Sequence, residues 1–247
     1  MEILGIDIGG TGIKGAIVNV QTGELTTERH RIPTPRPATT NAVSETIGQM
    51  VEHFKWKGKI GCGFPTPLLH GKCLSNGNLH ESWKGTQVNE LFKNVTGNEF
   101  SVVNDADAAG LAEISFGAGK NIDGVVIMIT LGTGIGSGVF FNGHLLQNTE
   151  LGHVLNKKGD SFEDYTSDSA RKRDGLNRKE WGKRLNKYFS HIEFLLSPDL
   201  FIIGGGASKK LDKYIDQIDI RTPIVAAMAE NEAGIIGAAM AANFEIK

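Results

Sequence analysis

The sequence contains few cysteines, little proline and no long hydrophobic run. Cys62 and Cys73 are its only cysteines, too few for a disulfide framework, which predicts a reducing compartment. No apolar run reaches the length that spans a membrane, and the first residues read as a strand rather than a secretory signal, so we expect a cytoplasmic protein. Neither sign of charge dominates: 26 Lys and Arg against 28 Asp and Glu give a formal net charge of −2. This balance argues against a protein that coats nucleic acid or an anionic membrane.

Glycine, by contrast, is abundant, with 32 residues against 7 prolines in a chain of 247. Without collagen periodicity, this excess indicates backbone turns that must approach something closely. Hydrophobic residues at 40% and charged residues at 22% are typical of a folded globular protein. Strand-like segments alternate with segments of helical apolar spacing, such as residues 40–54, 105–116 and 178–196, which predicts an α/β protein.

The chain opens with a pattern that recurs in its second half. A strand-like run, a glycine turn and a second strand-like run occupy residues 2–8, 9–12 and 13–20. The same order returns at residues 125–131, 132–136 and 137–142. This internal echo predicts two lobes that each begin with the same arrangement.

The first glycine turn formally satisfies the G-x-G-x-x-G pattern of dinucleotide-binding proteins over residues 10–15. That pattern requires a helix after the turn, whereas a strand follows here, and no Gly-Lys-[Ser/Thr] is present to form a Walker loop. A glycine hairpin turn can expose backbone N–H groups as a nest for phosphate oxygens, or it can be an ordinary tight hairpin. Two copies, each with a threonine beside glycine and the first with Asp7 and Lys14 nearby, favour phosphate binding.

Two further motifs carry polar side chains suited to a sugar. Asn104 and Asp105 stand where a strand ends and a helix begins, so either could cap the helix, or Asp105 could accept a proton from a hydroxyl group. The two residues alone favour the cap. Glu150 and His153 supply the acceptor and donor that sugar hydroxyls need, although standing alone they are better explained as a polar loop. Zinc needs more ligands at short spacing, and neither cysteine lies near His153.

A basic block lies in the second half of this otherwise balanced chain. Such a block is usually the solvated face of a helix, but it can also form a track for a long anion. The residues that we consider for a track are Lys157, Lys158, Arg171, Lys172, Arg173, Lys183 and Arg184.

Together these motifs resemble the ROK family (repressors, open reading frames and sugar kinases), and within it the glucokinases that use polyphosphate. The resemblance covers nearly the whole chain and rests on Asp7-Ile-Gly-Gly-Thr-Gly-Ile-Lys-Gly15, Asn104-Asp105, Leu131-Gly-Thr-Gly-Ile-Gly-Ser-Gly138, Glu150-Leu-Gly-His153 and Gly204-Gly-Gly206. The similarity to the polyphosphate subgroup rests on Ser169-Ala-Arg-Lys-Arg-Asp-Gly175, Tyr188-Phe-Ser-His-Ile-Glu-Phe194, Ser197-Pro-Asp-Leu-Phe201 and Arg221-Thr-Pro-Ile224.

The resemblance implies an actin-like, hexokinase-type fold of two lobes with the active site between them. We place the small N-terminal lobe at residues 1–105, with a C-terminal helix at about 234–247 returning to it, and the large lobe at residues 106–233. The implied reaction is phosphorylation of the 6-hydroxyl of glucose by inorganic polyphosphate. The alternatives are an ATP-dependent glucokinase, a kinase for a related hexose, and, outside the enzymes, an actin-like or sugar-sensing binding protein.

The resemblance also implies roles for individual residues. Asp105 is expected to accept the proton of the glucose 6-hydroxyl. The expected glucose contacts are Asn78, Asn104, Asp105, Glu150, His153 and Glu163. The expected contacts of the phosphoryl donor are Asp7, Gly9, Gly10, Thr11, Gly12, Lys14, Gly132, Thr133, Gly134, Gly204, Gly205 and Gly206.

Magnesium is the expected cofactor, because it offsets the charge of the phosphoryl donor, and Asp7 is its expected protein contact. Many ROK proteins carry a cysteine-rich zinc motif soon after the Gly-His pair, but residues 154–162 contain no cysteine, so we expect no zinc site. A homodimer is expected from the resemblance alone. Neither nucleic acid nor a membrane is expected as a partner.

Overall fold

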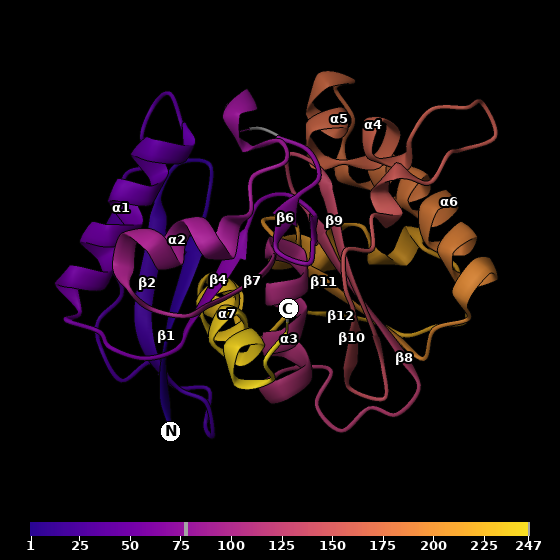
Figure 1. Ribbon diagram of the computed structural model, residues 1–247. Helices are drawn as coiled ribbons and strands as arrows, with labels where there is room; N and C mark the ends of the chain where they lie inside the picture. The colour runs from indigo at the N-terminus through magenta and orange to yellow at the C-terminus, as the bar shows by residue number, and fades with distance from the viewer. Residues whose placement is uncertain (77–78, 247) are drawn as a thin grey trace. The chain divides into compact units, whose positions relative to one another are not determined.

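The computed structural model describes residues 1–76 and 79–246, and its contacts divide the chain into two compact units (Figure 1). Unit 1 comprises Met1–Phe116 together with the C-terminal segment from Asn231, and unit 2 comprises Gly117–Glu230. Our predicted boundary followed Asp105. The helix that begins at Asp105 instead belongs to unit 1, because it packs against the C-terminal helix.

Strands and helices alternate in both units. The elements of unit 1 are β1 (Glu2–Ile8), β2 (Ile13–Asn19), β3 (His30–Ile32), α1 (Thr40–His53), β4 (Ile60–Phe64), β5 (Leu68–Leu69), β6 (Lys72–Cys73), η1 (Glu81–Trp83), α2 (Val88–Thr96), β7 (Phe100–Asn104), α3 (Asp105–Phe116) and α7 (Ala233–Asn243). The elements of unit 2 are β8 (Val125–Leu131), β9 (Ile135–Phe141), β10 (His144–Leu146), η2 (Leu151–His153), α4 (Phe162–Thr166), α5 (Asp168–Arg173), α6 (Arg178–Leu196), β11 (Leu200–Gly204), η3 (Ser208–Lys213), η4 (Ile215–Gln217) and β12 (Ile224–Ala226). The short helix η5 (Glu230–Glu232) spans the boundary.

The two five-stranded sheets have the same topology. The strand order is β3-β2-β1-β4-β7 in unit 1 and β10-β9-β8-β11-β12 in unit 2. In each sheet the central strand, β1 or β8, pairs antiparallel with the strand that follows it in the chain and parallel with its other neighbour. The predicted α/β class is confirmed, and the sequence echo corresponds to a repeated sheet in which each glycine turn joins the antiparallel pair.

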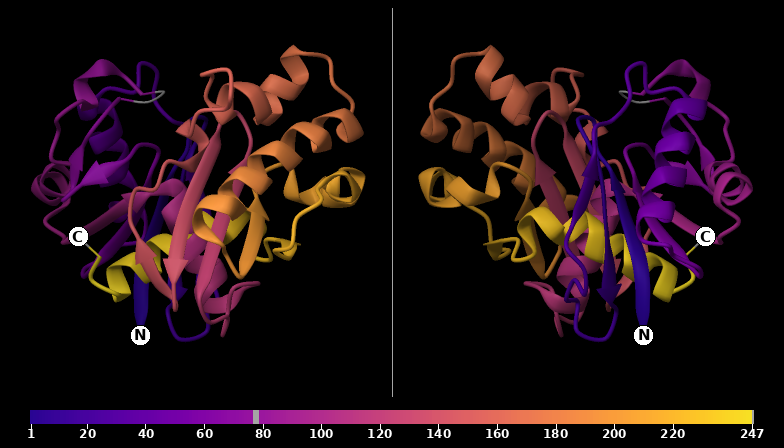
Figure 2. Two further views of the ribbon diagram at one scale, coloured as in Figure 1. Left: turned by 90° about the vertical axis from the view of Figure 1, so that its right-hand side faces the viewer. Right: turned by 90° about the vertical axis from the view of Figure 1, so that its left-hand side faces the viewer.

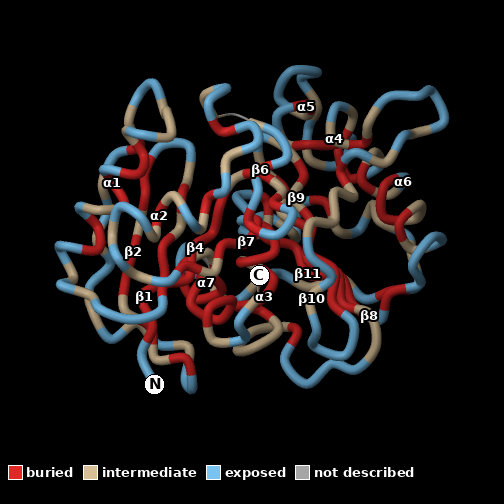
Figure 3. The backbone as a smooth tube through the Cα atoms, in the orientation of Figure 1, coloured by how far each residue is buried: buried red, intermediate tan, exposed pale blue. Residues whose placement is uncertain are grey.

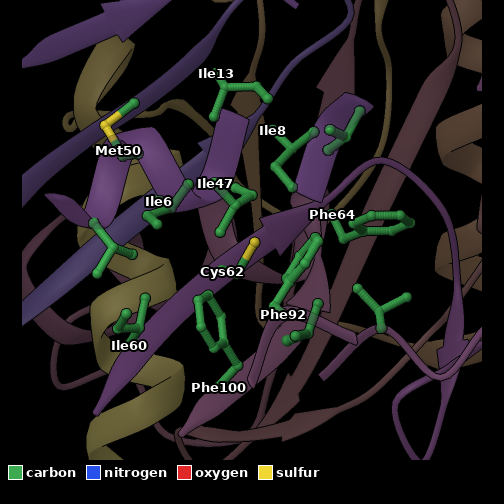
Figure 4. Packing of buried hydrophobic residues seen from close by; sticks show 14 of the residues in the cluster. Ile6, Ile8, Ile13, Ile47, Met50, Ile60, Cys62, Phe64, Phe92 and Phe100 are labelled. Atoms are coloured by element: carbon green, nitrogen blue, oxygen red, sulfur yellow. The ribbon is translucent and has the colours of Figure 1, made fainter. Parts of the chain in front are cut away.

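One face of the first sheet is covered by α1 and α2. β4 is buried at every residue, as expected of a central parallel strand. Figure 3 shows how burial concentrates along the strands of the sheet. Figure 4 shows Ile47 and Met50 of α1 and Phe92 of α2 packed in one cluster with Ile6 and Cys62. Both cysteines are buried free thiols.

Helices α3 and α7 pack together, and α7 lies on β1 and β4 (Figures 1 and 2). The approach is so close that it requires glycine. A Cβ atom at Gly61 of β4 would lie 1.7 Å from the carbonyl oxygen of Ala238, and one at Gly237 of α7 would lie 1.6 Å from that of Ala108. The small-residue helix therefore packs backbone against backbone, which a larger side chain at either glycine would prevent.

In unit 2, the amphipathic helix α6 covers the second sheet. Its bounds agree with the helix predicted at residues 178–196. A capping box fixes its start, because Asn177 accepts from the Glu180 N–H and Glu180 accepts from the Asn177 N–H. Leu185 and Phe189 are fully buried in a cluster with Phe201 of β11. Within residues 1–76 and 79–246, no helix is long and apolar enough to span a membrane.

We predict that Gly237→Ala lowers the free energy of unfolding by about 1–3 kcal/mol, because the new methyl group overpacks the contact between α7 and α3. Gly48→Ala in α1 is the matched control: its Cβ atom would meet only a Val95 methyl group at 3.4 Å, and alanine favours the helix by up to about 1 kcal/mol. Denaturant unfolding of both variants measures the difference. Equal effects of the two substitutions would contradict this account of the packing.

Candidate active site

The first glycine turn connects β1 to β2 and is held by its carbonyl groups. The Gly9 N–H donates to the Gly12 carbonyl oxygen at 3.1 Å, Thr34 Oγ1 donates to the Gly9 carbonyl oxygen at 2.6 Å, and Arg31 Nη2 donates to the Thr11 carbonyl oxygen at 2.6 Å. Gly10 and Thr11 are exposed, and we find no acceptor for their N–H groups among the described residues. The turn is therefore fixed mainly through its acceptors, while the N–H groups of Gly10 and Thr11 remain available to an anion, as a nest requires.

Asp7 and Lys14 lie opposite each other across the β1–β2 pair, next to this turn. Lys14 Nζ donates to Asp7 Oδ2 at 3.2 Å, and the two side chains are 30% and 17% exposed. The carboxylate also lies against the first turn of α7, since a Cβ atom at Gly234 would come within 2.8 Å of Asp7 Cγ. The structure thus brings a cation and a carboxylate together beside the first glycine turn.

The second glycine turn connects β8 to β9 at the equivalent place in the second sheet and is one residue shorter than the first, with Leu131 paired to Ile135. The Gly132 N–H donates to the Gly134 carbonyl oxygen at 3.0 Å, and the exposed residue Thr133 stands at the tip. Gly205, with φ of 73°, lies against the end of β8, where a Cβ atom would come within 2.7 Å of the Leu131 carbonyl oxygen. The predicted donor residues of unit 2, Gly132–Gly134 and Gly204–Gly206, therefore lie near one another.

The structure separates the roles of Asn104 and Asp105. Asn104 ends β7 and is 7% exposed, and its Oδ1 accepts from the Ala106 N–H at 2.9 Å, so Asn104 is the residue that caps α3. Asp105 is the first residue of α3 and is exposed. The cap interpretation is therefore confirmed for Asn104, while the side chain of Asp105 is accessible at the start of a twelve-residue helix.

Glu150 precedes the short helix η2 in unit 2, and His153 is the last residue of this helix. His153 Nε2 lies 3.8 Å from Glu150 Oε2, and their side chains are 63% and 33% exposed. Burial raises the pKa of Glu150, and the charge of Glu163 raises it further, while His153 acts in the opposite direction. The Glu150 carboxylate can accept hydrogen bonds from a polyol, and the His153 imidazole can donate or accept them.

The predicted basic block is partly neutralised by two aspartates within it. Asp168 binds Arg171 Nε at 2.7 Å, Lys172 Nζ at 2.9 Å and Arg178 Nη1 at 3.2 Å. Asp174 binds Arg173 Nε at 2.8 Å and Arg184 Nη1 at 2.6 Å. Burial opposes the ionisation of Asp168, but hydrogen bonds from Arg171 and Lys172 outweigh it and lower its pKa. Hydrogen bonds from Arg173 and Arg184 lower the pKa of Asp174 to about 2.

The other predicted members of the track, Lys157, Lys158 and Lys183, are exposed, and none of them forms an ion pair within the described part of the chain. The structure therefore divides the predicted track into ion-paired residues and available lysines. A count of charges along the sequence could not separate ion-paired cations from available ones, because Asp168 and Asp174 lie within the basic block and only the structure shows which cations they bind.

The predicted site residues divide between the two units. Unit 1 carries the first glycine turn with Asp7 and Lys14, and it carries Asn104 and Asp105. Unit 2 carries the second glycine turn, the glycines 204–206, Glu150, His153 and Glu163. Asn78 lies outside the described residues.

The chain offers little by itself to hold a metal ion. Over the described residues, no three His, Cys, Asp or Glu side chains gather as a metal site. Magnesium, however, is commonly bound by one or two carboxylates together with substrate phosphates and water. The half-buried carboxylate of Asp7, beside a turn with exposed N–H groups, fits an ion that arrives with a phosphoryl donor.

Sequence reasoning missed several residues that shape the site. Arg31, in β3, and Thr34, in the loop that follows, hold the first glycine turn from 20 and 25 residues along the chain. Tyr188 of α6 is fully buried in unit 2, and its hydroxyl has no hydrogen-bond partner among the described residues. Burial, with the charges of Glu163 and Glu150, raises the pKa of Tyr188, so that it stays neutral. No local motif points to Arg31 or Thr34, and the motif that begins at Tyr188 assigns this residue no role.

Comparison with known proteins defines the class. The ROK family profile matches residues 3–171. The polyphosphate glucokinase of Mycobacterium tuberculosis (strain ATCC 25618 / H37Rv) is 44% identical over 238 residues, which cover 96% of this chain and 89% of the relative. That of Mycobacterium leprae (strain TN) is 42% identical over 243 residues, which cover 98% of this chain and 75% of the relative. The chain belongs to the ROK family, as its motifs predicted.

Solved structures agree. The crystal structure of an inorganic polyphosphate/ATP-glucomannokinase from Arthrobacter sp. strain KM matches with a TM-score of 0.91 at 46% identity and covers 99% of both chains. A ROK family glucokinase from Streptomyces griseus, in complex with glucose and AMPPNP, matches with a TM-score of 0.83 at 23% identity, which shows the fold alone. The predicted two-lobed, actin-like fold of ROK sugar kinases is confirmed.

Asp168 provides a test of the ion-paired cluster. Because its pKa is lower in the folded protein than in the unfolded chain, where it is about 3.9, its contribution is present above about pH 4 and is lost as the pH falls through the folded value. Asp168→Asn should lower the free energy of unfolding at pH 7 by about 1–3 kcal/mol, and the difference from the wild type should shrink below about pH 4. Denaturant unfolding across this range, with exposed Asp216→Asn as control, checks it. A loss that is independent of pH would contradict the ion-pair assignment.

Proposed function

We propose that this protein transfers the terminal phosphoryl group of inorganic polyphosphate to the 6-hydroxyl of glucose and so forms glucose 6-phosphate. The observation that carries the proposal is similarity above 40% identity, over nearly the whole chain, to proteins named for polyphosphate in both the sequence and the structure comparisons. The exposed N–H groups at the tip of the first glycine turn, with Lys14 beside them, support phosphate as the ligand of this part of the chain.

Asp105 is the proposed general base. Its accessible carboxylate accepts the proton of the 6-hydroxyl as the hydroxyl oxygen forms a bond to the terminal phosphorus. The bond from that phosphorus to the bridging oxygen breaks, and the shortened polyphosphate leaves. The cap formed by Asn104 supports this role, because it fixes the start of α3 and therefore the position of Asp105. Glucose is held by Asn78, Asn104, Glu150, His153 and Glu163.

The phosphoryl donor is held by the glycine turns, with Lys14 and Gly204–Gly206 contributing. Backbone N–H groups suit this task, because they stabilise phosphate charge without a side chain that must be ordered. Magnesium, when bound with the donor, supplies positive charge to the phosphate oxygens, and Asp7 is the residue that would hold it. The ion pair between Asp7 and Lys14 keeps both groups beside the first turn.

ATP is the second candidate donor, because the Arthrobacter protein is named for both polyphosphate and ATP and for a glucomannokinase activity. A related hexose could accordingly replace glucose. We also propose that the protein lies in the cytoplasm, acts in glycolysis and forms a homodimer. The buried free thiols of Cys62 and Cys73 support a reducing compartment, while the homodimer rests on the family alone.

The test of the function is formation of glucose 6-phosphate by the purified protein with Mg²⁺ and glucose, measured in parallel with long-chain polyphosphate and with ATP. We expect turnover with polyphosphate and its loss when a chelator removes Mg²⁺. Turnover with ATP alone would replace the proposed donor. No turnover with either donor, together with no thermal stabilisation by glucose, would overturn the proposal in favour of a non-enzymatic protein.

In the same assay, the triple variant Lys157→Gln, Lys158→Gln, Lys183→Gln should raise the KM for long-chain polyphosphate about tenfold, as expected for the loss of three exposed charge contacts, and change that for tripolyphosphate much less. The charge-matched control replaces Lys55, Lys57 and Lys120, which are exposed and outside the basic block. An equal rise in the KM for long-chain polyphosphate and for tripolyphosphate would show that these lysines do not bind along the polyphosphate chain.

Asp105→Asn should lower kcat by about 10²–10⁴, the usual size of a general-base effect, because the amide cannot take the proton. Glucose binding, followed by thermal stabilisation, should persist in this variant. Near-normal turnover would remove Asp105 from the mechanism.

A further inference from the structure

The carboxylate of Glu163 lies on the second glycine turn. Glu163 Oε2 accepts from the Ile135 N–H at 2.7 Å, and Ile135 is the residue with which β9 begins after the turn. A Cβ atom at Gly134 would lie 2.3 Å from the same Oε2 atom. The carboxylate therefore fills the space that this glycine leaves open. Glu163 and Ile135 are 28 residues apart in the chain.

The segment that carries Glu163 is firmly attached within unit 2. Trp181 Nε1 donates to the Thr166 carbonyl oxygen at 2.8 Å, and Arg184 Nη1 donates to the Tyr165 carbonyl oxygen at 3.0 Å, so α6 holds α4 in place. A second bond reaches the turn directly, because the Ser169 N–H donates to the Gly132 carbonyl oxygen at 3.3 Å. The turn is thus bonded at both ends. Gly132, its first residue, accepts from Ser169, and Ile135, which follows the turn, donates to Glu163.

A carboxylate at this place needs a reason, because its charge repels a phosphate bound to the turn. Glu163 is only half buried, so it does not serve to fill the core. Its contact with Ile135 occupies one oxygen, and a carboxylate has acceptor capacity on both oxygens. One oxygen can therefore fix the backbone of the turn while the other accepts from a hydroxyl group of a ligand.

We infer that Glu163 is a positioning residue for the phosphoryl donor as well as a contact for the sugar: Oε2 fixes the second glycine turn, and Oε1 receives a sugar hydroxyl. This inference rests on the proposed function. It predicts that donor binding depends on Glu163 even when no sugar is present, which a residue that only contacts sugar would not show. A single side chain then links the acceptor site to the geometry of the donor turn.

Two substitutions separate the roles. Glu163→Ala removes both acceptors, whereas Glu163→Gln keeps one oxygen, which can still accept from the Ile135 N–H. Both remove the negative charge, so electrostatics alone would make both variants bind an anionic donor more tightly. We expect Glu163→Ala to weaken the binding of Mg²⁺–tripolyphosphate without glucose about tenfold, the effect of losing one charge-assisted hydrogen bond. Glu163→Gln should bind this probe at least as well as the wild type and should raise the KM for glucose.

Asp164→Asn is the matched control, because Asp164 is the neighbouring acid on α4 and its carboxylate bonds Ser161 rather than the turn. Gly134→Ala provides a second approach, since its methyl group would displace the Glu163 carboxylate from the turn while leaving Glu163 in the chain. Gly134→Ala and Glu163→Ala break the same contact. The double variant should therefore lose no more donor affinity than the more affected single variant.

Amide hydrogen exchange at Ile135 gives a readout that does not depend on the proposed function. Exchange should accelerate in Glu163→Ala and return to the wild-type rate in Glu163→Gln. The inference is overturned if Glu163→Ala leaves either this exchange rate or donor binding without glucose at its wild-type value. If the wild type binds neither Mg²⁺–tripolyphosphate nor Mg²⁺–ATP, the proposed function fails instead, and an unchanged exchange rate in Glu163→Ala still refutes the positioning role.

Discussion

The absence of a Cβ atom at a few glycines is the constraint on which both units depend. In unit 1, Gly61 and Gly237 allow the backbone of α7 to touch β4 and α3, so the C-terminal segment can complete a layer formed by the first half of the chain. In the turns, Gly10 has open space around it, and Gly134 leaves room for a carboxylate. The abundance of glycine therefore has two separate causes, close packing of a helix and access to backbone N–H groups.

The two turns are equivalent in topology but are supported differently. The first is held through the carbonyl oxygens of Gly9 and Thr11 by Thr34 and by the cationic side chain of Arg31. The second is held from a helical segment, through an N–H group that donates to the anionic side chain of Glu163. A repeated sheet thus carries two turns with different supports: side-chain donors bind carbonyl oxygens of the first turn, whereas a side-chain acceptor binds an N–H group at the end of the second.

The sequence predicts the parts of the fold whose signals are local and long. α6 extends over five turns with a buried stripe and a capping box, and its bounds are predicted correctly. β4 and β11 are short but fully buried, and their apolar runs reveal them. By contrast, α4 has five residues and α5 has six, too few for a helical period to emerge from the sequence. The predicted boundary after Asp105 differs from the observed one after Phe116, because α3 is held in unit 1 by packing against α7. These helices lie more than a hundred residues apart in the chain, so no local signal reveals the contact.

The same limit applies to the site. Asn104 and Asp105 are found from their place between a strand and a helix, but only the bond from the Ala106 N–H to Asn104 assigns the cap to the first of them. The structural and the functional interpretation of this motif are then not rivals. Asn104 satisfies a donor of α3 that would otherwise be unpaired, and it thereby fixes the helix end at which Asp105 stands. A side chain on such a rigid support needs little reorganisation to meet a ligand, and accurate positioning is what phosphoryl transfer demands of the protein.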